Sequence, residues 1–207
     1  MAKMSETAIM RTLDFAYDKA VNGVPGFDTA EEMAQDYLSK NVSPEKAAKS
    51  LVRWQAAKAG GSGFLTGLGG LITMPVGIPA NIASVLYVQV RMIAAIAVMG
   101  GYDLRSDQVK TMVNLALIGN SIKDVVKNVA ISIGKKSAKS MIKNLSSEAI
   151  KKINQRVGFK LLTKFGEKGV INLVKIIPLF GGIIGGTMDS SGTWIIGKVA
   201  IKSFIGE

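Results

Sequence analysis

Arg91 is the residue whose setting points most directly to chemistry. It is the only charged residue between positions 60 and 101, and an unpaired cation is costly in a protein core and in lipid alike. We therefore expect it to have a partner, and the acidic residues nearest to apolar sequence are Asp103 and Asp189. Asp103 lies twelve residues further on, about 18 Å along a continuous helix. Asp189 is therefore the better candidate.

These three residues allow three interpretations. The simplest is a buried ion pair that serves the structure alone. The second is contact with an anionic ligand or a lipid headgroup, and the third is a weak catalytic site. We assign no catalytic residue, and Arg91, Asp103 and Asp189 stand as weak candidates only.

The residue types that are missing exclude several function classes. The chain of 207 residues has no histidine and no cysteine, which excludes histidine-dependent triads, thiol redox chemistry and zinc sites built from these residues. The glycine runs at 60–63 and 67–70 lack the Gly-Lys-Ser/Thr ending of a P-loop. Residues 187–192 do not form the Gly-x-Ser-x-Gly elbow of a hydrolase. We expect no cofactor and no metal, and an enzyme is disfavoured.

A block of basic residues is the second candidate site. The chain has 26 Lys and Arg against 15 Asp and Glu, for a net charge of +11, and residues 120–175 hold 13 basic residues against three acidic ones. Helical spacing places these cations opposite apolar faces, which is typical of helices lying on anionic lipid. The predicted lipid-binding residues are Lys135, Lys136, Lys139, Lys143, Lys151, Lys152, Arg156, Lys160 and Lys164.

Two other interpretations of this block stay open. A run of charges is often only a solvated face. Nucleic acid is disfavoured as a partner, because Arg156 is the only arginine among these cations and aromatic residues for base stacking are few. An anionic membrane surface attracts basic residues by about 1 kcal/mol each, so lipid is the favoured partner.

The elements that position these residues are predicted to be helices. No clear alternation of polar and apolar residues indicates a strand, whereas several segments begin with helix-capping signals. We therefore predict an all-α fold, a single helical domain around a central apolar helical hairpin and flanked by amphipathic basic helices. The capping signals are Thr29 with Glu32, Ser43 before Pro44, and Ser106 with Asp107.

The central hairpin spans residues 63–101. Pro75 and Pro79 divide it into arms over 63–74 and 80–101, because neither helix can continue through proline cheaply. The second arm is long enough for a membrane span of about 20 residues, and the first is short. The hairpin can form the protein core, dip into a bilayer or span it.

The ends of the chain suggest its organisation and location. Residues 1–59 are predicted to form amphipathic helices that pack on a domain over 60–207, making one structural unit. The N-terminus lacks the apolar run of about 7–15 residues that marks a secretory signal. We therefore expect a cytoplasmic protein, peripheral to or hairpin-inserted at the inner face of the cell membrane.

Several blocks of sequence resemble the EcsC protein family. They comprise residues 63–80, 88–97, 100–103, 157–169 and 178–186, and the resemblance covers about residues 45–204. The resemblance implies a bacterial protein. It also implies a link to membranes, because the family's namesake lies beside an ABC-transporter pair implicated in secretion and membrane physiology. It supplies no activity, cofactor or catalytic residue.

Three functional hypotheses follow. The first is a membrane-associated accessory protein that binds anionic lipid and has a membrane transporter as a possible partner. The second is a pore-forming or membrane-inserting protein of bacterial conflict, because soluble pore formers also enclose an apolar hairpin in amphipathic helices. The third is a lipid-directed enzyme that uses Arg91, Asp103 and Asp189. Oligomeric state is left open.

Overall fold

The computed structural model describes residues 5–59, 78, 80–122, 124–125, 138–165 and 183–206. Within these ranges the chain is helical, and the single departure toward β-structure is an isolated antiparallel bridge between Val24 and Phe27. The predicted all-α fold is confirmed. The helices are α1 (Glu6–Asn22), α2 (Ala30–Ser39), α3 (Pro44–Ala59), α5 (Ala80–Met99), α6 (Asp107–Ala116), the 3₁₀ turn η1 (Gly119–Ser121), α8 (Ala138–Lys143), α9 (Ser147–Phe165) and α11 (Ile183–Phe204).

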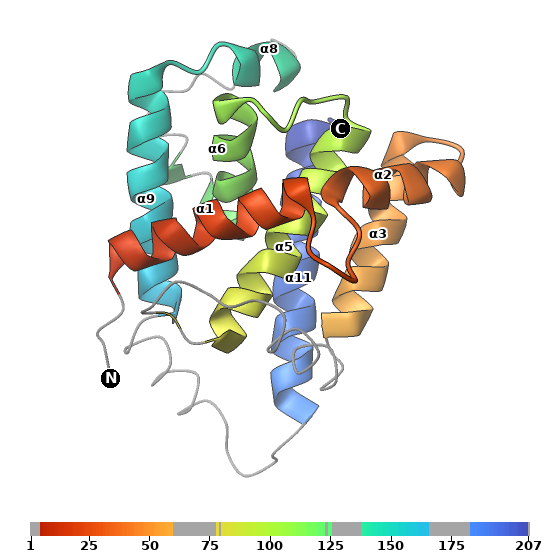
Figure 1. The fold of residues 1–207 in the computed structure, drawn as a ribbon, viewed down its shortest axis with the longest axis horizontal. Coiled ribbons are helices and arrows are strands. Elements are labelled where there is room, and N and C mark those ends of the chain that lie inside the picture. The colour runs from red at the N-terminus through yellow and green to blue at the C-terminus, as the bar shows by residue number, and fades with distance from the viewer. Residues whose placement is uncertain are drawn as a thin grey trace.

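Helix α5 forms the centre of the molecule. It packs against α1, α2, α3, α6 and α11 (Figure 1), and its large side chains Leu86, Tyr87, Met92 and Ile93 are fully buried. This helix is the second arm of the predicted hairpin. The first arm, residues 63–74, lies outside the described residues.

The burial of α5 bears on the membrane question. Its stretch Ile82–Met99, with a mean hydropathy of 1.9, is the one candidate span among the described helices. However, 89% of that stretch is buried inside the protein. The second arm of the hairpin is therefore enclosed by its neighbours in this structure. The core helix of a water-soluble domain is likewise long, apolar and buried.

The predicted helix starts are confirmed by their hydrogen bonds. Thr29 and Glu32 form a capping box, in which the Glu32 amide donates to Thr29 Oγ1 at 3.1 Å and the Thr29 amide donates to the Glu32 carboxylate at 2.8 Å. The bonds that the Thr29 amide and hydroxyl donate to the Glu32 carboxylate lower the pKa of Glu32. Ser43 and Ser106 cap α3 and α6 by accepting hydrogen bonds from the amides of Lys46 and Val109.

A tight turn links α1 to α2 and carries two residues to α5. Gly23 ends α1 with a φ of 92°, and Pro25 and Gly26 then occupy the centre of a turn closed by the Phe27 amide and the Val24 carbonyl at 3.0 Å. Gly26 has a φ of 82°, as the third residue of a type II turn requires. The turn directs Phe27 and Asp28 toward Arg91 of α5.

Of the basic helices, α9 lies on the opposite side of the view from α3, and α8 lies at the top (Figure 1). Helix α9 packs on α1 and α6 through the buried residues Ile153, Val157 and Leu161. Helix α6 ends at Ala116, and Gly119 in the following turn η1 has a φ of 56°.

Helices α3 and α11 meet at a glycine. A Cβ atom built on Gly197 would lie 2.4 Å from Cγ1 of Val52, whose side chain is buried and has no room to retreat. The same construction on Gly192, in the same helix, meets nothing within 4 Å. The close approach of the two backbones therefore depends on Gly197.

Alanine substitutions at these two glycines test the packing. We expect Gly197→Ala to lower the free energy of unfolding by about 1–3 kcal/mol because of overpacking. Gly192→Ala should raise it by about 0.5–1 kcal/mol because alanine favours the helix. Urea denaturation followed by circular dichroism measures both. Adding Val52→Ala to Gly197→Ala should recover part of the loss, and a Gly197→Ala protein as stable as the Gly192→Ala protein would contradict the close contact.

Candidate functional site

The residues singled out in the sequence fall into two separate places. Arg91 is buried in α5, whereas the described lysines of the basic block lie at the surface on α8 and α9. Lys135 and Lys136 lie outside the described residues. The two places therefore have to be considered as different sites.

Arg91 is only 6% exposed and is held mainly by uncharged groups. Its Nη1 donates to the backbone carbonyl of Asp28 at 3.0 Å. Its guanidinium carbon lies 5.5 Å from the ring centroids of both Phe27 and Tyr87, within the range of cation–π attraction. Its Nε is buried and has no hydrogen-bond partner.

The two carboxylates proposed as partners of Arg91 have different outcomes. Asp103 is exposed, and its Oδ1 accepts a hydrogen bond from the Arg105 amide at 2.9 Å, which closes the turn before α6. Asp189 belongs to α11, but its side chain lies outside the described part of the chain, so its pairing with Arg91 stays a prediction. The partner that the structure does show, the Asp28 carbonyl, was missed because a backbone acceptor leaves no mark in residue types.

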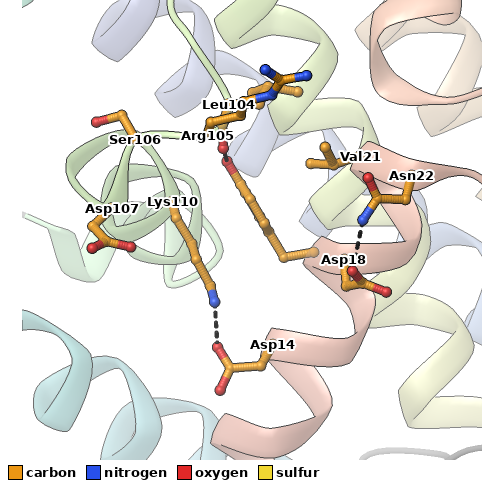
Figure 2. Close-up of a pocket in the computed structure, with 10 residues that line it drawn as sticks. Asp14, Asp18, Val21, Asn22, Leu104, Arg105, Ser106, Asp107 and Lys110 are labelled. Carbon is orange, nitrogen blue, oxygen red and sulfur yellow. Dashed lines mark hydrogen bonds and ion pairs between the residues drawn. The ribbon is translucent and has the colours of Figure 1, made fainter.

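A surface cavity of about 320 Å³ lies where α1 faces α6 (Figure 2). Lys110 reaches across it to Asp14 at 2.8 Å, and the Tyr17 hydroxyl donates to the Leu104 carbonyl at 2.8 Å. Burial, and then the charges of Asp103 and Asp107, raise the pKa of Tyr17 well above its ordinary value. The raised pKa keeps the hydroxyl protonated as a donor. The hydrogen bond to Leu104 and the ion pair with Lys110 connect α1 to α6 and to the turn before it.

The basic face of α8 and α9 is the larger of the two candidate sites. Lys143, Lys151 and Arg156 are exposed and make no ion pair with any described residue. Lys152 pairs with Glu148 at 2.6 Å, which lowers the pKa of that carboxyl.

The remaining lysines of this face are partly engaged. Lys139 lies over the Tyr102 ring at 5.6 Å from its centroid, and Lys164 lies 5.1 Å from that of Phe165. Lys160 is half-buried. Of the predicted cations, Lys151 and Arg156 are therefore the α9 residues best placed to meet an external anion.

An exposed aromatic residue interrupts this basic face. Phe159 is 55% exposed, three residues after Arg156 and eight after Lys151, so the three side chains share one side of α9. Phe159 was not among the predicted lipid-binding residues. The helical spacing did indicate its position. Val157 and Leu161 lie on the buried side of α9, and Phe159, which is two residues from each, lies on the outer side.

Metal binding has no support in the part of the chain that the structure describes. No group of three or more acidic side chains is arranged there to hold an ion. Asp14, one of the acidic residues at the surface, forms an ion pair with Lys110 instead.

Substitution of Arg91 tests whether the fold needs its charge. Methionine keeps much of the side-chain volume and removes the desolvated cation, and such replacements are often close to neutral. We expect Arg91→Met to change the free energy of unfolding by no more than about 1 kcal/mol, and Arg91→Ala to lower it by about 2–4 kcal/mol because it leaves a cavity. Urea denaturation compares the two. An Arg91→Met protein as unstable as the Arg91→Ala protein would mean that the guanidinium contacts themselves hold this region.

Comparisons with known proteins identify the family. The chain matches no curated protein and no solved structure. The sequence model of the EcsC protein family matches residues 6–205. This match extends the resemblance from about residue 45 back to the start of α1. Because this match covers nearly the whole chain, the N-terminal helices, the buried α5 and the basic α9 all lie within it, and the protein belongs to the EcsC protein family.

Proposed function

We propose that this protein is a peripheral membrane accessory protein whose α9 face binds anionic lipid at the inner face of the cell membrane. The observation that carries the proposal is the combination of Lys151 and Arg156, which have no counter-ion among the described residues, with the exposed Phe159 on one side of a folded helix. Basic residues with an aromatic among them are typical of helices that lie in a membrane interface.

The energies involved suit reversible binding. Each basic residue near an anionic surface contributes about 1 kcal/mol, and burial of a half-exposed phenylalanine contributes about the same. Five basic residues lie on α9, and one of them, Lys152, is already paired with Glu148. The total is enough for attachment that salt can reverse.

The packing of α9 supports this role. Ile153, Val157 and Leu161 fix its inner side against α1 and α6, so the helix needs no ordering when it meets a membrane. A preformed surface avoids the entropy loss that accompanies folding on binding. The basic side chains therefore lie on a helix that is already folded before it meets lipid.

The buried core helix favours a peripheral arrangement over insertion. For Ile82–Met99 to enter a bilayer, α5 would have to leave the five helices that enclose it. The resemblance to the EcsC namesake adds a membrane transporter of the ABC class as a protein partner within this proposal. Release of an entrapped dye from vesicles would instead favour the pore-forming alternative.

Charge reversal on α9 tests the lipid surface. Lys151→Glu combined with Arg156→Glu should weaken binding to vesicles that contain phosphatidylglycerol by about 30-fold or more, because at least two favourable contacts of about 1 kcal/mol each are lost. Co-sedimentation measures the partition coefficient, and the wild-type affinity should fall as salt is added.

The matched control is Lys46→Glu combined with Lys202→Glu, which changes the net charge equally at exposed positions on α3 and α11. Binding that falls equally in both double variants would point to net charge alone. Equal binding to neutral and acidic vesicles, or tighter binding to duplex DNA than to acidic vesicles, would contradict the proposal.

Phe159→Ser tests interfacial insertion separately from charge. Because the side chain is exposed, we expect the free energy of unfolding to change by less than about 0.5 kcal/mol. Binding to acidic vesicles should weaken roughly fivefold, as loss of about 1 kcal/mol implies. Trp194→Ser, which removes an exposed aromatic residue from α11, should leave vesicle binding unchanged. Unchanged vesicle binding by Phe159→Ser would exclude insertion of this side chain.

A further inference from the structure

A second cavity, of about 280 Å³, lies between the Pro25–Gly26 turn, α2, α3 and α5. Its volume is near the lower end of the range for small-ligand sites. Arg91 and Gln55 line it, and Trp54 and Lys58 of α3 stand beside them. Helices α2 and α3 are on the opposite side of the view from α9 (Figure 1), and no residue of α9 lines this cavity.

Arg91 brings an unused donor to this cavity. Nη1 is occupied by the Asp28 carbonyl, but Nε has no partner although it is buried. Buried donors in proteins are nearly always paired. The Nε edge of a guanidinium, with the terminal nitrogen on the same side, is the fork that takes two oxygens of a phosphate or carboxylate.

Gln55 brings an unused acceptor. Its side chain is only 4% exposed, and its Nε2 lies 3.9 Å from the sulfur of Met33. Its Oε1 is buried without a hydrogen-bond partner. An acceptor of this kind calls for a hydroxyl group. Two residues that line the cavity, Arg91 and Gln55, therefore carry an unpaired donor suited to an oxyanion and an unpaired acceptor suited to a hydroxyl.

The charges around the cavity permit an anion. Asp36 also lines it, but that carboxylate is paired with Lys40 at 2.6 Å. Asp28 is the other acidic residue that lines the cavity, and the cations Arg91 and Lys58 line it as well. The Lys58 Nζ lies 5.0 Å from the centroid of the Trp54 ring. Trp54 is 54% exposed and forms an aromatic wall.

We propose that this cavity binds a small oxyanion that carries a neighbouring hydroxyl, the chemistry of a glycerol phosphate, either free or as a lipid headgroup. Arg91 holds the phosphate, Gln55 accepts from the hydroxyl, and Trp54 covers the carbon chain. The Tyr87 hydroxyl lies beside the same guanidinium: burial raises its pKa, whereas the charge of Arg91 and a hydrogen bond with that side chain lower it.

The two tryptophans of the chain make a direct test. Each is exposed and has a lysine four residues later over its ring, Lys58 for Trp54 and Lys198 for Trp194. Trp194→Phe leaves Trp54 as the only tryptophan, whose fluorescence then reports on the cavity. Trp54→Phe leaves Trp194 as the only tryptophan and gives the matched control. Titration with glycerol 3-phosphate should give a saturable fluorescence change from Trp54 and none from Trp194.

Comparison of probes identifies the recognised groups. Inorganic phosphate should bind more weakly than glycerol 3-phosphate, and glycerol should not bind. Dihexanoyl phosphatidylglycerol, below the concentration at which it forms micelles, distinguishes the two sources. Tighter binding of this lipid than of glycerol 3-phosphate assigns the site to a headgroup, and weaker binding assigns it to the free phosphate ester.

Two substitutions in the Trp54 reporter test the residues. Arg91→Met should weaken the binding of glycerol 3-phosphate by at least about tenfold, because the fork is lost. Gln55→Glu, which is nearly isosteric and places a carboxylate beside the oxyanion, should do the same and decides the matter if the Arg91 variant fails to fold. Circular dichroism checks folding. The absence of a saturable change, an equal response from Trp194, or binding unaffected by these substitutions would overturn the proposal.

Discussion

The structure depends on the enclosure of α5. Eighteen residues of this helix, Ile82–Met99, are apolar enough to cross a membrane, yet most of their surface is buried by protein. Exposure of that surface to water would be costly, at about 25 cal/mol for each Å². Helices α1, α2, α3, α6 and α11 therefore cover it from all sides. Close contacts such as Gly197 against Val52 allow this cover to be tight.

This enclosure also determines where charge can lie. Helices that face α5 use their inner sides for packing. Helix α9, which carries five basic residues, packs on α1 and α6 instead. Arg91 is the exception, because it remains within α5 as a nearly buried cation. One carbonyl and two aromatic rings satisfy it only in part, because its Nε has no hydrogen-bond partner. Arg91 also lines the cavity beside α3.

Local signals in the sequence were sufficient to predict much of the fold. The Thr29–Glu32 capping box and the Ser106 cap act within a few residues, so they can be recognised without tertiary structure. The partner of Arg91 could not be recognised in this way. Asp28 is 63 residues away and contributes a backbone carbonyl, so a search for carboxylates leads to Asp189 and Asp103 instead. Of these, Asp103 closes a local turn. Phe159 was detectable in principle, since its position relative to Val157 and Leu161 places it on the outer side of α9.

In the proposed function, α5 stays enclosed by the other helices, and the protein contacts the membrane through its surface alone. Extraction of membranes from cells that produce the full chain tests it most directly. Concentrated salt should release the protein in folded form, because screening removes the attraction between basic side chains and anionic lipid. Retention in the membrane at high salt, with release only by detergent, would show that apolar sequence enters the bilayer and would contradict the account.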